Sequence, residues 1–109
     1  MYPRLVVDLK KLRSNLDACA KIVKEDGGCS LMIVTKGLCA DPEMARMVAD
    51  HPAVEFMADS RVANIKTYAA EARAKGKKTV LLRLPMACET AEVVKYVDLS
   101  FNSELATIR

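Results

Sequence analysis

The chain has 109 residues, of which 51% are hydrophobic and 28% charged, so it holds enough apolar material for a packed core and is not expected to be disordered. Its 17 basic and 14 acidic residues leave a net charge of +3, and aromatic residues make up only 5%. This mild, scattered charge argues against a nucleic-acid partner. No apolar run approaches the ~20 residues of a membrane span, and the N-terminus lacks a signal-peptide pattern, which together predict a cytoplasmic protein without a membrane partner.

The chain contains four cysteines, Cys19, Cys29, Cys39 and Cys88, and a single histidine, His51. The cysteines form no C-x-x-C pair and stand at no ligand spacing from the histidine, so we expect free thiols and no metal site. His51 falls in a predicted helix-to-strand loop and is expected to be an ordinary exposed histidine.

The first predicted elements are a strand and a helix. Residues 5–7 are apolar and rich in β-branched side chains, which predicts a short strand. Asp8 stands where a helix cap is expected. Apolar residues then recur at steps of three or four over residues 9–23, which predicts an amphipathic helix that ends at Gly27-Gly28.

A second strand–helix unit and the start of a third follow. Residues 31–34 form a continuous apolar run, typical of a strand buried on both faces of a parallel sheet. Asp41, followed by a proline and a glutamate, predicts the start of a helix. Residues 54–57 predict the next strand, and Asp59 or Ser60 is expected to cap the helix after it.

The remaining elements continue the alternation. Residues 79–82 predict a strand that is closed by Pro85, and residues 90–96 predict a short helix. Residues 97–101 predict a further strand, and a last helix is expected to begin at residues 102–104. Alternating strands and helices predict an α/β fold with a parallel sheet covered by helices. The spacing suits either a (β/α)8 barrel or a doubly wound sheet, and periodicity does not choose between them.

Parallel α/β folds place their active sites at the carboxyl ends of the strands, so the residues that follow each predicted strand are the candidates for a site. They are Lys36 after the second strand, Asp59, Ser60 and Arg61 after the third, Arg83 after the fourth, and Ser100, Asn102 and Ser103 at the end of the fifth. Helix capping can explain Asp59, Ser60 and Ser103. Lys36 and Arg83 need another explanation.

Lys36 follows an apolar strand, where partial desolvation would favour the neutral, nucleophilic amine that a Schiff-base lysine requires. The alternative is a lysine that extends to solvent from a strand end. Arg83 can pair with a substrate carboxylate or a phosphate, or it can form an ion pair with Asp59 or another rim acid. Asn102 can bond a ligand or end its strand in a turn.

The sequence resembles the N-terminal region of the alanine-racemase-like, fold-type III pyridoxal-phosphate (PLP) enzymes, and more closely the branch that includes ornithine racemase. The resemblance covers the whole chain. The elements that carry it, in order, are Tyr2-Pro3-Arg4-Leu5, Asp8-Leu9, Asn15, Val34-Thr35-Lys36-Gly37, Asp59-Ser60-Arg61, Asn64-Ile65, Leu81-Leu82-Arg83 and Asp98-Leu99-Ser100-Phe101-Asn102-Ser103-Glu104.

The resemblance implies that residues 1–109 are the N-terminal part of a PLP-binding (β/α)8 barrel, without the rest of the barrel or the C-terminal β domain, which residues 5–7 would join. It implies a PLP-dependent amino-acid racemase in which Lys36 forms an aldimine with the cofactor and exchanges the substrate α-proton on one face. A tyrosine of a partner subunit would serve the other face, in a homodimer.

Around Lys36 we expect two groups of site residues. Those expected to bind the cofactor are Arg83, Ser100 and Asn102, and those expected at the rim as substrate candidates are Asp59, Ser60, Arg61 and Ser103. The phosphate anchor and the second base would lie outside this chain.

The sequence departs from alanine racemase itself at Ala40, four residues after the lysine, where that enzyme has a tyrosine that supports the cofactor. Three alternatives to a racemase remain: a non-catalytic PLP carrier, a PLP-dependent aldolase or decarboxylase, and an α/β domain without a cofactor. A complete barrel takes about 250 residues, so the 109-residue chain alone is expected to be inactive.

Overall fold

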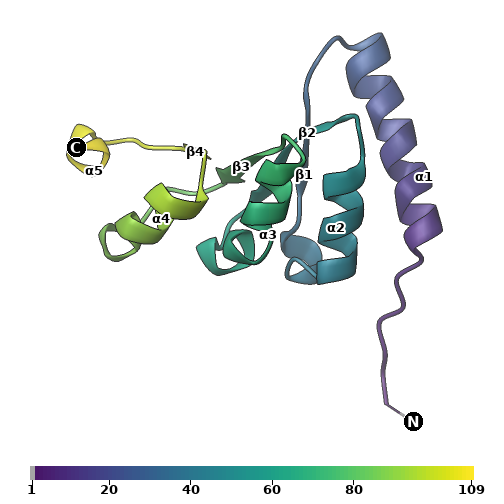
Figure 1. The fold of residues 1–109 in the computed structure, drawn as a ribbon, viewed down its shortest axis with the longest axis horizontal. Coiled ribbons are helices and arrows are strands. Elements are labelled where there is room, and N and C mark those ends of the chain that lie inside the picture. The colour runs from purple at the N-terminus through teal and green to yellow at the C-terminus, as the bar shows by residue number, and fades with distance from the viewer. Residues whose placement is uncertain (1) are drawn as a thin grey trace.

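The computed structural model describes residues 2–109 as alternating helices and strands (Figure 1). The helices are α1 (Leu9–Ala20), α2 (Pro42–Asp50), α3 (Val62–Ala74), α4 (Thr90–Tyr96) and α5 (Leu105–Ile108). The strands are β1 (Leu31–Val34), β2 (Val54–Asp59), β3 (Lys78–Leu81) and β4 (Leu99–Ser100). A π-helical segment, η1 (Lys21–Asp26), extends α1, and two 3-10 turns, η2 (Lys36–Leu38) and η3 (Ala87–Glu89), follow β1 and β3. Within residues 2–109, no helix is long and apolar enough to cross a membrane.

The strands form one sheet in the order β1-β2-β3-β4, and every neighbouring pair is parallel. Each strand is therefore joined to the next by a connection that returns to the same edge of the sheet. Figure 1 shows α2, α3 and α4 side by side on one face of the sheet, and α1 beside α2 at its margin. The predicted α/β class with a helix-covered parallel sheet is confirmed.

The core lies between the sheet and this helical layer. Met57 and Leu81 point from adjacent strands into the layer, where they pack with Ile65 of α3, and all three side chains are fully buried. The opposite face of the sheet is only partly covered: Val34 and Leu99 on the outer strands are 43% and 47% exposed, while Ala58 and Val80 between them are buried. The prediction that residues 31–34 are buried on both faces is therefore wrong for the described residues, because nothing in residues 2–109 covers Met32 and Val34 on the second face.

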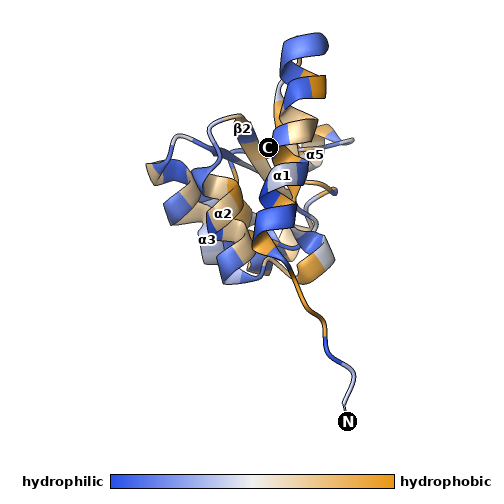
Figure 2. Ribbon diagram, turned by 90° about the vertical axis from the view of Figure 1, so that its right-hand side faces the viewer, coloured by the Kyte–Doolittle hydropathy of each residue, from blue (hydrophilic) through white to orange (hydrophobic). Residues whose placement is uncertain are grey.

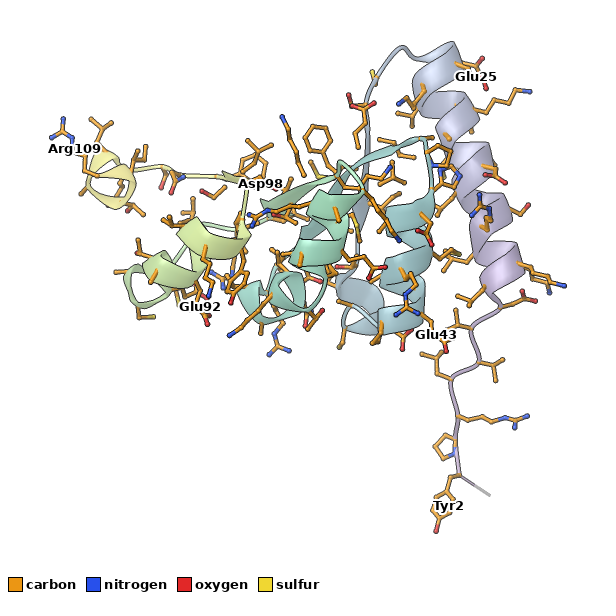
Figure 3. The ribbon with its side chains drawn as sticks, in the orientation of Figure 1. Tyr2, Glu25, Glu43, Glu92, Asp98 and Arg109 are labelled. Carbon is orange, nitrogen blue, oxygen red and sulfur yellow. The ribbon has the colours of Figure 1, made fainter. Side chains whose placement is uncertain are left out.

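The N-terminal segment also differs from expectation. Residues 5–7 form no strand in the structure, and Leu5 is 76% exposed. Figure 2 shows this apolar stretch running away from the body of the molecule, and in Figure 3 Tyr2 lies near its far end. A strand needs a neighbouring backbone to satisfy its amide groups, and residues 8–109 offer none here, which explains why the local β signal was not sufficient.

Two predicted helix starts are confirmed by their capping bonds. The carboxylate of Asp8 accepts from the backbone amides of Lys10 and Lys11 at 3.0 and 3.1 Å, and so caps α1. Asp41 caps α2 in the same way, by accepting from Glu43 N at 3.1 Å and from the following amide. Such a cap stabilises a helix by about 1 kcal/mol.

Other boundaries shift from the prediction. The N-cap position of α3 is Arg61, so neither Asp59 nor Ser60 caps it as expected; the carboxylate of Asp59 accepts from the Arg61 amide from just outside the helix. β4 covers only two of the residues in 97–101, and α5 begins at Leu105 rather than at 102–104.

His51 is buried, which contradicts the expectation of an exposed histidine. Its Nδ1 accepts from Ala53 N at 3.2 Å, and its Nε2 lies 2.6 Å from Asp17 Oδ1 of α1. Because the backbone amide can only donate, Nδ1 carries no proton and Nε2–H donates to the carboxylate. The imidazole thus ties α1 to the loop before β2, a long-range contact that the sequence pattern does not show.

Replacing His51 with alanine is expected to lower the free energy of unfolding by about 1–3 kcal/mol, because it leaves the half-buried Ala53 amide without its acceptor and removes the hydrogen bond to Asp17. Urea denaturation of the longest natural form of this chain measures the change. Lys10→Ala, on the exposed side of α1, is the control and should change stability by less than about 0.5 kcal/mol. Equal effects of the two substitutions would contradict the anchoring role.

Candidate functional site

The carboxyl edge of the sheet gathers the residues that the sequence singled out. Lys36 begins η2 directly after β1, Asp59 ends β2, Arg83 follows β3, and Ser100 ends β4. The parallel register pairs Asp59 with Leu81 and Leu81 with Ser100, so these strand ends lie level with one another. The predicted placement of these residues along one edge is confirmed, while their chemical roles stay predictions.

The amine of Lys36 is available at this edge. Lys36 is exposed, and within residues 2–109 its side chain makes no hydrogen bond or ion pair. The structure therefore does not show the partial desolvation expected from the apolar strand, because the sheet face beside the lysine is only partly covered. What the structure does show is a primary amine held on a defined turn and not engaged by a neighbouring carboxylate.

The turn that carries Lys36 has an unusual backbone. Ala40 N donates to Thr35 O at 3.0 Å, and Cys39 N donates to Lys36 O at 3.1 Å. Cys39 and Ala40 are both left-handed, with φ of 51° and 54°. Non-glycine residues in this conformation each cost roughly 1–2 kcal/mol, so surrounding contacts must hold the turn in place. Ala40 is 3% exposed and packs in the core, so a tyrosine here would have to displace core atoms.

A buried polar cluster lies directly behind this turn. The Thr35 hydroxyl is 2.7 Å from Asp59 Oδ2 and 3.2 Å from the Tyr68 hydroxyl of α3. Thr35 and Asp59 are fully buried, and Tyr68 is 3% exposed. Burial raises the pKa of the Tyr68 phenol to about 12, so its hydroxyl keeps its proton at neutral pH and is a hydrogen-bond donor.

Asp59 completes its hydrogen bonds with neutral groups. Its oxygens accept from Arg61 N at 2.9 Å and from Asn64 Nδ2 at 3.2 Å, in addition to the Thr35 hydroxyl. Among the described residues, no lysine or arginine side chain pairs with this carboxylate, and the start of α3 supplies the nearest favourable dipole. Because Asp59 is fully buried, its carboxylate cannot touch a substrate in this structure, although it lies at the predicted rim.

Arg83 forms an ion pair with Glu89. Its Nη1 and Nη2 donate to the two carboxylate oxygens at 2.8 and 2.5 Å, and its Nε donates to Ser60 O at 2.7 Å. A further bond joins Nη1 to Leu84 O at 3.1 Å. The alternative of an ion pair with a rim acid is thus the one seen, with Glu89 and not Asp59 as the acid. The guanidinium joins the ends of β2 and β3, and its assignment to the cofactor stays a prediction.

The β4 end of the edge is more open. Ser100, Asn102 and Ser103 are all exposed, and so is Arg61 in the loop after β2. Asn102 Nδ2 donates to Ser100 Oγ at 3.1 Å, which favours the turn interpretation of this asparagine. Asn102 and Ser103 also line a pocket of about 210 Å³ beside Pro85. Their hydroxyl and amide groups therefore remain accessible to a ligand.

Sequence reasoning did not identify the partners of these residues. Thr35, Tyr68 and Asn64 surround Asp59, and Glu89 holds Arg83. The available signal was position: Thr35 stands between the apolar run of β1 and the lysine, and Glu89 follows Arg83 by six residues. In the part of the chain that the structure describes, no group of three or more histidine, cysteine or acidic side chains gathers to form a metal site.

The ion pair makes a prediction about acid stability. Arg83 and the amide of Met86 lower the pKa of Glu89 from its ordinary value of 4.5 to about 2. A lowered pKa means that the carboxylate stabilises the folded state above pH 4.5 and that this contribution is lost as the pH falls toward 2. Glu89→Gln is therefore expected to flatten the decline in stability over this interval, as followed by urea denaturation at several pH values. Glu92→Gln, on the exposed surface of α4 (Figure 3), is the control and should keep the wild-type slope.

Comparison with known proteins places the chain among racemase relatives. It is 41% identical to ornithine racemase of Acetoanaerobium sticklandii over 111 aligned residues, which cover 100% of this chain and 29% of that protein. It is 31% identical to lysine racemase of Thermotoga maritima over 98 residues, which cover 90% of this chain and 27% of that protein. No family model and no solved structure matches the chain. Over its whole length, then, the chain is a relative of proteins named as racemases, and it spans less than a third of their length.

Proposed function

We propose that this chain is part of a PLP-dependent amino-acid racemase in which Lys36 binds the cofactor. The observation that carries the proposal is the position of the Lys36 amine: exposed at the carboxyl edge of a parallel sheet, on a hydrogen-bonded turn, without an ion-pair partner in residues 2–109. The names of the two relatives, ornithine racemase and lysine racemase, support amino acids as the substrate class and racemisation as the reaction.

The Lys36 amine and the space beside it fit the aldehyde end of PLP. An uncharged primary amine is the group that bonds to an aldehyde carbon, and Lys36 is followed by Gly37, around which a β-carbon would meet no atom within 4 Å. Room for a planar ring next to the amine is consistent with this open position. When bound, PLP supplies an electron sink that stabilises negative charge on the substrate α-carbon.

The residues of this chain would then have distinct tasks. Lys36 Nζ would hold the cofactor and move the α-proton on one face of the substrate. Ser100 and Asn102 are accessible enough to contact the cofactor, and Ser60, Arg61 and Ser103 the substrate. Arg83 is less available because its guanidinium is bound to Glu89 and to two carbonyl oxygens.

We further propose that residues 1–109 belong to the N-terminal part of a (β/α)8 barrel. The partly covered face of the sheet supports this, since Met32, Val34 and Leu99 would line the interior of a closed barrel. The exposed apolar residues 5–7 suit a strand that pairs outside the described residues. A homodimer, whose partner subunit supplies the base for the second face of the substrate, completes the proposal.

Treatment of the longest natural form of the chain with PLP and then borohydride is expected to fix a pyridoxyl group on Lys36. The amine nitrogen bonds to the aldehyde carbon with loss of one water, and hydride makes the new bond permanent. Peptide mapping identifies the modified lysine, and Lys36→Met is the control that should abolish the adduct. An adduct spread evenly over Lys36 and exposed lysines such as Lys10 would contradict the assignment.

The same protein is expected to abolish the optical rotation of single-enantiomer ornithine or lysine, or of another amino acid in a panel, as measured by polarimetry. Lys36→Ala should lower the rate by more than about a thousandfold, since it removes the group that handles the proton. The isolated 109-residue chain should show no turnover.

The outcome of these two experiments also distinguishes a racemase from the alternative PLP proteins. Cofactor on Lys36 without loss of rotation from any amino acid would indicate a non-catalytic PLP carrier. Released aldehyde or amine would indicate an aldolase or a decarboxylase.

A further inference from the structure

The Thr35 hydroxyl lies between a buried carboxylate and a buried phenol, immediately before Lys36 in the chain. A hydroxyl has one proton to donate, and an ionised carboxylate can only accept. The shortest bond, 2.7 Å to Asp59 Oδ2, therefore takes the Thr35 proton, and the Tyr68 hydroxyl donates to Thr35 Oγ1 over 3.2 Å. The charge on Asp59 thus sets the direction of both hydrogen bonds.

Thr35 is held by its backbone as well. Its amide donates to Ala58 O of β2 at 2.9 Å, and its carbonyl accepts from Ala40 N at 3.0 Å, closing the turn around Lys36. The side-chain bond to Asp59 adds a third fixed point, from the same neighbouring strand. Because the turn contains two left-handed residues, these bonds offset its strain and keep it in one conformation.

Burying an ionised group is unfavourable in free energy, so stability alone does not explain this contact. A buried carboxylate without a cationic partner loses much of its hydration energy, and neutral hydrogen bonds return only part of it. Asp59 has neutral partners in the described residues, namely the Thr35 hydroxyl, the Asn64 amide and the Arg61 backbone amide. The direct hydrogen bond of this carboxylate to Thr35, the residue before Lys36, points to a role in the site.

We propose that Asp59 is a positioning residue that acts through the Thr35 hydroxyl to hold the Lys36 amine at the carboxyl edge. The inference rests on the proposed function, in which Lys36 bonds to PLP. It does not require Asp59 to touch cofactor or substrate, which its complete burial prevents.

The sheet contains a matched control for this arrangement. Thr79, near the amino end of β3, is also fully buried, and its hydroxyl lies 3.1 Å from Asp98 Oδ2 and 2.7 Å from Tyr96 O. In Figure 3, Asp98 lies beside β4, at the start of that strand. Thr79→Val therefore removes the hydroxyl of another fully buried threonine, which donates to Tyr96 O, at the opposite edge of the sheet.

The experiment uses the longest natural form of the chain, prepared without cofactor, as wild type and as Thr35→Val, Thr35→Ser, Asp59→Asn and Thr79→Val. Each protein receives a brief pulse of PLP and borohydride, and peptide mapping gives the ratio of adduct at Lys36 to adduct at Lys10. Urea denaturation of each variant measures its stability. The ratio reports the placement of one amine, whereas a general loss of structure affects both lysines.

Thr35→Val and Asp59→Asn are expected to lower the ratio by roughly tenfold or more, because a displaced amine reacts less readily. Thr35→Ser retains the hydroxyl and should stay within about twofold of wild type. Thr79→Val should lower stability about as much as Thr35→Val and leave the ratio unchanged. If Thr35→Val does not fold, Asp59→Asn, which conserves the shape of the side chain, gives the same comparison.

The positioning role would be overturned if the ratio of Lys36 to Lys10 adduct in Thr35→Val, or in folded Asp59→Asn, equalled the ratio in Thr79→Val. The proposed function fails separately, if wild-type Lys36 reacts with PLP no faster than Lys10. In that case the same variants are treated with acetic anhydride, which acetylates lysines without a cofactor site. A ratio of Lys36 to Lys10 acetylation that is lower in Thr35→Val than in Thr35→Ser supports the positioning role of Asp59, and equal ratios overturn it.

Discussion

The hydrogen bond between the Thr35 hydroxyl and the Asp59 carboxylate joins the ends of β1 and β2, and the arrangement of the carboxyl edge depends on it. It fixes the residue from which the lysine turn departs. It also draws in Tyr68, so that α3 is tied to both strands. The neighbouring ends of β2 and β3 are joined in a different way, by Arg83 and its ion pair with Glu89. This ion pair is partly accessible, whereas the cluster of Thr35, Asp59 and Tyr68 is buried. The two junctions together keep adjacent strand ends level.

Much of this fold is written in local patterns. The apolar run at β1, the Asp41 cap and the apolar periodicity of α1 were all predictable, because each depends on residues within a few positions of one another. Residues 5–7 show where local reasoning ends, since a strand exists only when another strand accepts it. The burial of His51 is another case: it depends on how α1 packs against the loop before β2, which no periodicity reveals.

The candidate site divides in the same manner. The alignment of Lys36, Asp59 and Arg83 along one edge follows from topology, because parallel strands present their carboxyl ends together. The hydrogen-bond partners of these residues do not follow from topology. Tyr68 reaches Thr35 only because α3 packs over the sheet, and Glu89 reaches Arg83 because of the η3 turn. The exposure of Lys36, where the sequence predicted partial desolvation, also could not be foreseen, because it depends on what covers the second face of the sheet.

The paired left-handed residues Cys39 and Ala40 have a consequence for how this turn can vary in sequence. Glycine, which usually weakens a structure, would relax the backbone at either position, whereas valine or isoleucine would clash with its own carbonyl. At Ala40 the core adds a limit on size. The loop after the lysine therefore favours unbranched side chains, and position 40, which is packed in the core, accepts only a small one.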